Sequence, residues 1–280
     1  KAMRLPVRPC RFPTMWNWIS MPDFPSSLLT ERPVEGVLLL KLNRPERRNA
    51  LATSLLQEIA SALAEASQDE TVRVAVITGN DKVFAAGADI DELAAGGSGD
   101  PIETTRFQAW ASIRAFPKPL IAAVEGWCLG AGTELMLCAD IVIAAENATI
   151  GLPETNLGIM PGAGGTVILP RIVGRALAMK MVLTGEPISA VVALSAGLIA
   201  QVTEPSETLQ GALTLAEKLA SRAPLALRAA KASIRDADFL DEAAHLVEER
   251  RRFIQLLGTS DKTEGIAAFK EKRAPVWRGD

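Results

Sequence analysis

The chain has 280 residues, of which 48% are apolar and 22% are charged, and its formal net charge is −3. This is the composition of an ordinary globular protein, and a mildly acidic chain has no overall attraction for nucleic acid or for an anionic membrane surface. Its longest apolar runs are far shorter than the roughly 20 residues of a membrane-spanning helix, so we expect neither nucleic acid nor a membrane as a partner.

Cysteine and histidine are too sparse to build a metal site. Cys10, Cys128, Cys138 and the single histidine, His245, form no C-x-x-C pair and show no zinc-like spacing. We therefore expect no metal. An odd and sparse set of cysteines is typical of a reducing compartment, which predicts a cytoplasmic protein.

Residues 1–22 differ in composition from the rest of the chain. They carry four basic residues, several prolines and no acidic residue. They lack the apolar stretch of about 7–15 residues that a signal peptide needs, and the prolines disfavour an amphipathic targeting helix. We expect an N-terminal extension, either added sequence or an upstream start, with Met21 as the natural first residue.

Strands and helices are predicted in alternation over the first half of the chain. Apolar runs predict strands at 34–42, 72–78, 120–124, 141–145 and 148–151. Apolar spacing and helix-breaking residues predict helices at 53–67, at 89–95, at 104–115 and from residue 131. This alternation is typical of an α/β domain with parallel strands.

Helical patterns dominate beyond residue 162. They predict helices at 165–173, 175–183, 189–195, 207–221, 224–235, 239–257 and 261–272. We therefore expect an α/β core at 23–200 and a helical C-terminal region at 201–280.

Several common catalytic motifs are missing. The sequence has no G-x-S-x-G elbow and no Walker A loop. Two glycine-rich loops, 130–135 and 162–167, begin like a dinucleotide fingerprint but end in Leu135 and Val167. A nicotinamide dehydrogenase is therefore disfavoured, and no permanently bound cofactor is expected.

The remaining chemistry lies in glycine-rich loops with carboxylates beside them. The chain has no tyrosine, so acid/base work falls on Asp, Glu, Lys or Cys. Glycines let main-chain N–H groups approach a ligand, and N–H groups at a helix start can hold an oxyanion. The residues themselves predict a site that stabilises negative charge on oxygen. Spacing alone does not establish that Glu134 and Glu154 meet in space.

Several ordered motifs resemble signatures of the enoyl-CoA hydratase (crotonase) family. They are LNRP and NAL at 42–51, FAAGADIDEL at 84–93, KPLIAAVEG and LGAGTEL at 118–135, GLPE and LGIMPGAGGT at 151–166, and FKEKR at 269–273. The resemblance covers about residues 32–280. Within the family, 110–132 and 160–165 most resemble bacterial hydratases of 2,3-dehydroadipyl-CoA in phenylacetate breakdown.

The resemblance implies a fold and a catalytic centre. The fold would be a spiral of ββα turns in the core, followed by C-terminal helices that build a trimer or a dimer of trimers. Ala88 and Ala131 would supply the two main-chain N–H donors of an oxyanion hole. Glu134 and Glu154 would form the acid/base pair.

The resemblance also implies where the substrate lies. The substrate would be an acyl-CoA thioester, with CoA as part of it. The acyl pocket would be lined by residues 92–116 and by C-terminal helices. The residues implied in CoA binding are Arg47, Ala50, Ala86, Asp89, Ile90, Lys270 and Lys272.

The reaction implied is syn addition of water to a 2-enoyl-CoA, giving a 3-hydroxyacyl-CoA. Retention of both glutamates favours hydration over the alternatives. These are a shift of the double bond by an enoyl-CoA delta-isomerase, or another reaction of the crotonase family on a CoA thioester. A further alternative is a non-enzymatic binding protein, but the acidic balance and the absence of a basic stripe disfavour an RNA-binding role.

Overall fold

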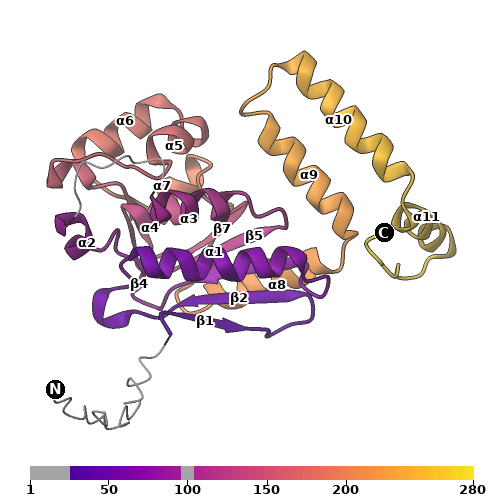
Figure 1. Ribbon diagram of the computed structural model, residues 1–280, viewed down its shortest axis with the longest axis horizontal. Coiled ribbons are helices and arrows are strands. Elements are labelled where there is room, and N and C mark those ends of the chain that lie inside the picture. The colour runs from indigo at the N-terminus through magenta and orange to yellow at the C-terminus, as the bar shows by residue number, and fades with distance from the viewer. Residues whose placement is uncertain (1–25, 96–103) are drawn as a thin grey trace, which may run out of the picture.

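The computed structural model describes residues 26–95 and 104–280. The predicted extension at 1–22 lies outside these residues. Two sheets and a set of helices form the described chain (Figure 1). The large sheet contains, in spatial order, β1 (Leu28–Glu31), β2 (Val37–Leu42), β3 (Val74–Thr78), β5 (Leu120–Val124), β7 (Ile141–Ala145) and β10 (Gln201–Thr203). The small sheet contains β4 (Val83–Ala85), β6 (Trp127–Leu129), β8 (Thr149–Gly151) and β9 (Ile188–Ser189).

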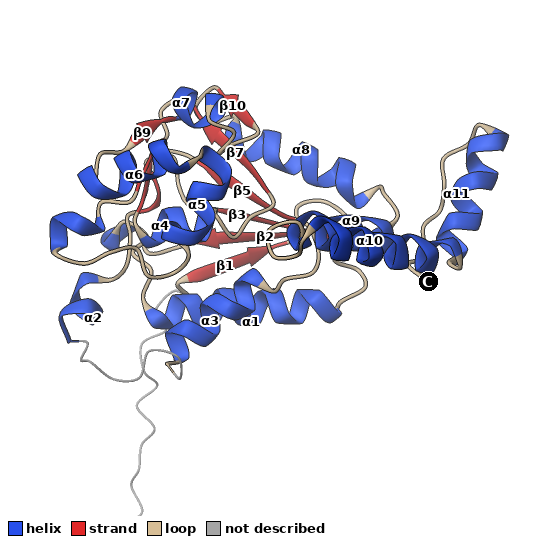
Figure 2. Ribbon diagram, turned by 90° about the horizontal axis from the view of Figure 1, so that it is seen from above, coloured by secondary structure: helices blue, strands red, loops and turns tan. Residues whose placement is uncertain are grey.

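Helices cover the large sheet on both faces, and its central strands are therefore apolar throughout (Figure 2). Alternate residues of a strand point to opposite faces. On β3, Val74 and Val76 belong to the cluster formed with α8 (Thr208–Ala220), whereas Ala75 and Ile77 belong to the cluster that contains α1 (Thr53–Gln68) and α3 (Thr105–Arg114). The sheet is therefore the central layer of the core.

The chain repeats one supersecondary unit as it passes between the sheets. After β3 it forms β4, then α2 (Ile90–Ala95) and α3. After β5 it forms β6 and α4 (Ala131–Met136). After β7 it forms β8, a 3-10 turn η2 (Glu154–Leu157) and α5 (Gly165–Val173). Within each sheet these successive strands pair in parallel. The result is the predicted spiral of ββα turns.

The large sheet extends past the predicted end of the core at residue 200. Its last strand, β10, pairs in parallel with β7, and α8 follows it across one face. The remaining elements of this half are α6 (Arg175–Thr184), α7 (Ala190–Ser195), α9 (Pro224–Asp236), α10 (Glu242–Leu257) and α11 (Ser260–Glu271). Among the described helices, none is long and apolar enough to cross a lipid bilayer.

Helices α9 and α10 form an antiparallel pair that extends away from the sheets (Figure 1). Within the described chain no residue of either helix is buried. Large apolar side chains on this pair are exposed instead, among them Ile234, Leu246, Val247, Phe253 and Ile254. A concentration of exposed large apolar side chains is typical of an interaction face.

Candidate functional site

The small sheet brings three distant segments together. Strands β4, β6 and β8 lie side by side in parallel, so the segments that follow them leave from the same edge of the sheet. These segments are residues 86–90, 130–134 and 152–157. Such an edge, at the carboxyl ends of parallel strands, is where α/β proteins commonly bind ligands.

Two unpaired main-chain N–H groups lie at this edge, on Ala88 and Ala131. Within the described chain neither N–H has a hydrogen-bond partner, and both residues line the same cavity. Each follows a glycine with a left-handed φ, +123° at Gly87 and +53° at Gly130. A methyl group added to Gly130 would lie 3.6 Å from Gly87 Cα, so the two turns approach closely. The pair has the character of an oxyanion hole.

Glu134 is a buried carboxylate whose position is fixed by main-chain donors. It lies on α4 and is only 3% exposed. Its Oε1 accepts hydrogen bonds from Ala163 N at 2.6 Å and from Gly165 N at 2.9 Å. Burial raises the pKa of the Glu134 carboxyl, and the two N–H donors partly offset that rise. These donors stabilise the ionised form.

Glu154 begins η2 and shares the cavity with Glu134. Its Oε2 is buried and, among the described residues, has no hydrogen-bond partner. Burial raises the pKa of Glu154 to about 7, and the nearby charge of Glu134 adds to the rise. A carboxyl with this pKa carries a proton about half the time at neutral pH, as a general acid or base requires.

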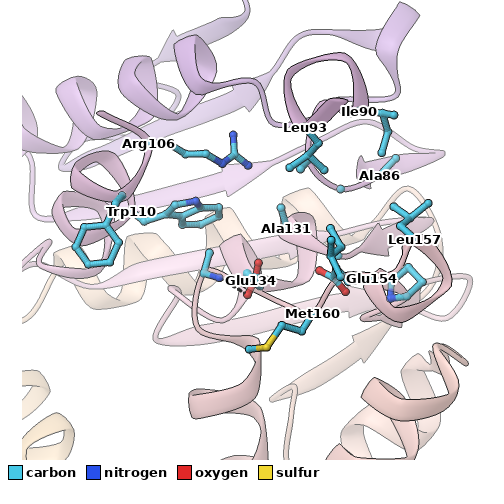
Figure 3. A pocket seen from close by; sticks show the side chains of 18 of the residues that line it. Ala86, Ile90, Leu93, Arg106, Trp110, Ala131, Glu134, Glu154, Leu157 and Met160 are labelled. Carbon is cyan, nitrogen blue, oxygen red and sulfur yellow. Dashed lines mark hydrogen bonds between the residues drawn. The ribbon is translucent and has the colours of Figure 1, made fainter. Parts of the chain in front are cut away.

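The two carboxyl groups face each other across the cavity, with Ala131 nearby (Figure 3). The cavity has a volume of about 310 Å³. Its other walls are largely apolar and include Ile90, Leu93, Phe107, Trp110, Leu157 and Met160. Two titratable groups with raised pKa values, beside free N–H donors in an apolar pocket, are the features expected of an active site.

The raised pKa of Glu154 predicts that Glu154→Gln is more stable than the wild-type protein at alkaline pH. The Glu154 carboxyl titrates near 7 when folded against an ordinary 4.5, so the folded state binds more protons between these values. Binding of this proton to Glu154 adds to the free energy of unfolding, and that contribution is lost as pH rises through about 7. Glutamine has no such loss. Because solvent screens a partly exposed group, we expect a gain of only about 1 kcal/mol, or about 2–4 °C in Tm.

Thermal melts of both proteins at pH 5 and pH 8 measure this difference. The glutamine variant should melt higher at pH 8, and the gap should be smaller at pH 5. An equal gap at both pH values would contradict the assigned shift.

Two of the segments implied in CoA binding, residues 47–50 and 86–90, are held together by main-chain hydrogen bonds. Ala86 N donates to Arg48 O at 3.1 Å, and Leu51 N donates to Gly87 O at 2.8 Å. Arg47 and Ala50 therefore lie beside the loop that carries Ala86, Asp89 and Ile90. Of these five residues, Ala86 and Ile90 line the cavity.

Asp89 is bound within the protein rather than open to a ligand. It is 8% exposed, and its carboxylate pairs with Arg44 at 3.1 Å. Burial opposes ionisation, but the hydrogen bond from Arg44 lowers the pKa of Asp89 overall. The side chain of Arg47 pairs instead with Asp91 at 3.0 Å on the surface.

Lys270 and Lys272 are not brought to this cavity within one chain. Lys270 lies on α11, and Lys272 is the C-cap residue that follows it. Helix α11 lies at the opposite end of the molecule from α2 (Figure 1). Within the described chain the cavity lining also ends at Ala163. The C-terminal helices, which we expected at the acyl pocket, therefore do not reach it in the single chain.

Helix α3 forms one wall of the cavity. The sequence indicated this wall only within the range 92–116. Arg106, Phe107 and Trp110 all line the cavity. Their spacing, i, i+1 and i+4, places Arg106 and Trp110 on one helical face, and that spacing could have identified Arg106. Trp127, on β6, is 50% exposed and is absent from the described lining.

Comparisons with known proteins agree with the geometry. A family model described as enoyl-CoA hydratase/isomerase matches residues 32–280. The chain is 50% identical to 2,3-dehydroadipyl-CoA hydratase of Escherichia coli (strain K12), over 91% of this chain and 99% of that protein. It is 38% identical to the mitochondrial enoyl-CoA hydratase of Pongo abelii, over 97% of this chain and 94% of that protein.

Solved structures show the same architecture. An enoyl-CoA hydratase from Bacillus anthracis superposes with a TM-score of 0.84 at 37% identity, covering 91% of this chain and 100% of that one. A likeness of this extent confirms the predicted fold class.

Proposed function

Because this chain belongs to the enoyl-CoA hydratase/isomerase family, as its motifs predicted, we propose that it adds water across the double bond of 2-enoyl-CoA thioesters. The observation that carries the proposal is the pair of carboxyl groups, Glu134 buried and Glu154 half-buried, that face one cavity. Beside them lie two main-chain N–H groups that have no partner within the described chain. CoA is part of the substrate, and the reaction needs no permanently bound cofactor.

In this mechanism the thioester carbonyl accepts hydrogen bonds from Ala88 N–H and Ala131 N–H. Negative charge develops on that oxygen as C3 is attacked, and the two donors stabilise it most in the transition state. A water molecule lies between the two carboxyl groups. Its oxygen bonds to C3 while a proton is added to C2 on the same face, which gives syn addition.

We assign Glu134 as the base and Glu154 as the acid. The hydrogen bonds from Ala163 N and Gly165 N favour the Glu134 carboxylate, which accepts a proton from water. With a pKa of about 7, Glu154 is protonated in about half of the molecules at neutral pH, and this form delivers its proton to C2. A proton then passes from Glu134 back to Glu154 and resets the pair.

A substrate panel tests the reaction class. Crotonyl-CoA should lose its conjugated enoyl absorbance as water is added, and 2-octenoyl-CoA and 2,3-dehydroadipyl-CoA measure the acyl preference. A 3-enoyl-CoA distinguishes hydration from isomerisation. Conversion of the 3-enoyl thioester without hydration of any 2-enoyl thioester would reject the hydratase in favour of the isomerase.

We further propose 2,3-dehydroadipyl-CoA, formed in phenylacetate breakdown, as the preferred substrate. The support is the 50% identity to the Escherichia coli protein named for that substrate. A cytoplasmic location forms part of this proposal, supported by Cys128 and Cys138, which are buried and unpaired. Activity that fractionates away from the cytoplasm would contradict it.

Self-association as a trimer or a dimer of trimers also belongs to the proposal. The exposed apolar side chains of α9 and α10 support it, since no residue of either helix is buried in the described chain. Association would also offer α11 of one protomer to the site of another, and with it Lys270 and Lys272 to the CoA phosphates. Light scattering of the purified protein measures the number of chains, and a monomer would contradict the arrangement.

A further inference from the structure

One cation interrupts the largely apolar wall of the cavity. Among the described residues that line it, Arg106 is the one with a positive charge. Its neighbours along α3 in the lining are Phe107 and Trp110. Figure 3 shows the Arg106 side chain extended toward Leu93. The charge of Arg106 lowers the pKa of Glu134, but it is not one of the two acid/base groups.

The described residues satisfy the guanidinium only in part. Arg106 Nη1 donates to Leu51 O at 3.0 Å, and the guanidinium approaches Glu92 Oε2 at 3.7 Å, beyond an ordinary hydrogen bond. A guanidinium has five N–H donors, and the side chain of Arg106 is only 26% exposed. Donors therefore remain for a partner inside the cavity.

The hydrogen bonds of Glu92 go to the N-terminus of α1 and not to Arg106. Its carboxylate accepts Thr53 N at 2.8 Å and Thr53 Oγ1 at 2.8 Å, where Thr53 is the first residue of α1. A carboxylate at a helix N-terminus satisfies free N–H groups there. Glu92 is thus held by α1 and only approaches Arg106, so the cation is not simply one half of a surface ion pair.

We propose that Arg106 binds a free carboxylate at the far end of the acyl chain and sets a preference for dicarboxylic 2-enoyl-CoA substrates. This inference rests on the proposed hydratase function. Arginine matches a carboxylate in charge and in geometry, because two parallel N–H donors meet two oxygens. In a six-carbon dicarboxylic substrate the carboxylate carbon lies three carbons beyond C3, the carbon that receives hydroxyl.

The test compares two six-carbon substrates on each protein. One is 2,3-dehydroadipyl-CoA, which has the carboxylate, and the other is 2-hexenoyl-CoA, which ends in a methyl group. The measured quantity is the ratio of their kcat/KM values. The wild-type ratio should favour the dicarboxylic substrate, and Arg106→Leu should lower it by about 10²-fold, the order found when one partner of a buried charge pair is removed.

Two further variants make the test specific. Arg106→Lys keeps the charge but loses the paired donors, and it should retain part of the preference. Gln108→Leu, at an exposed position of the same helix outside the cavity lining, should keep the wild-type ratio.

The outcomes separate this inference from the proposed function. Hydration of 2-hexenoyl-CoA with no preference for the dicarboxylic substrate in the wild-type protein would overturn the role of Arg106 alone. So would an unchanged ratio in Arg106→Leu, since a merely structural role lowers both rates together. If Arg106→Leu fails to fold, the wild-type and Arg106→Lys ratios decide the question. No hydration of either substrate by the wild-type protein would reject the hydratase itself.

Discussion

Replacing either cavity glutamate by glutamine should lower kcat for crotonyl-CoA hydration by about 10²–10⁴-fold, the usual contribution of a positioned acid or base. The amide that replaces the Glu154 carboxyl cannot deliver a proton to C2. The amide that replaces the Glu134 carboxyl cannot accept a proton from water. Each variant keeps the shape of the side chain, and in Glu134→Gln the amide oxygen can still accept the N–H groups of Ala163 and Gly165.

Stopped-flow or absorbance assays of the purified variants measure this loss. Affinity for a saturated acyl-CoA should stay close to the wild-type value, because the N–H donors and the cavity walls are unchanged. Glu70→Gln, at an exposed position, is the matched control and should hydrate at the wild-type rate. Near-normal turnover in either cavity variant would remove that glutamate from the mechanism.

Replacing Ala131 by proline should lower kcat by about 10²–10³-fold, the effect of removing one oxyanion donor. Proline has no N–H group, so this substitution deletes the donor itself. The backbone tolerates proline here, because Ala131 is the first residue of α4, where proline is favoured. Gly130, with φ 53° and ψ −126°, is also outside the helical region that a following proline disfavours.

Ala131→Gly is the control for the same position. It changes the side chain but keeps the N–H group, so its kcat should remain within a few-fold of the wild-type value. Circular dichroism melts establish that both variants fold. A proline variant that folds and still turns over at the wild-type rate would show that Ala131 N–H does not stabilise the transition state.

The large sheet could be predicted from the sequence because its strands are buried on both faces. β5 occupies Leu120–Val124, the predicted range, since five consecutive apolar residues follow Pro119 and end before Gly126. The small sheet was largely missed. β4 and β6 have three residues each, which is too short for an alternating pattern to stand out. No strand was predicted between the strand at 72–78 and the helix at 89–95, where β4 lies.

The site was harder to predict because it depends on contacts between distant segments. Taken alone, Glu134 has the sequence setting of an exposed helical carboxylate. It is nevertheless buried, and the distant loop that carries Ala163 donates a hydrogen bond to it. Its proximity to Glu154 follows from the pairing of β6 with β8, which no spacing along the chain reveals. The resemblance to a family implied in advance that the two glutamates act as a pair, whereas Arg106 lay outside the motifs and was not singled out.

The pair of glycine turns at Gly87 and Gly130 has a consequence for how the site can change over generations. The N–H groups of Ala88 and Ala131 belong to the peptide chain, so among single residue replacements only proline deletes one outright. The carboxyl groups are side chains, and one nucleotide change can exchange either. Descendants of this protein could therefore lose or alter proton delivery while still holding a thioester oxygen, which leaves a ready starting point for a different reaction on the same class of molecule.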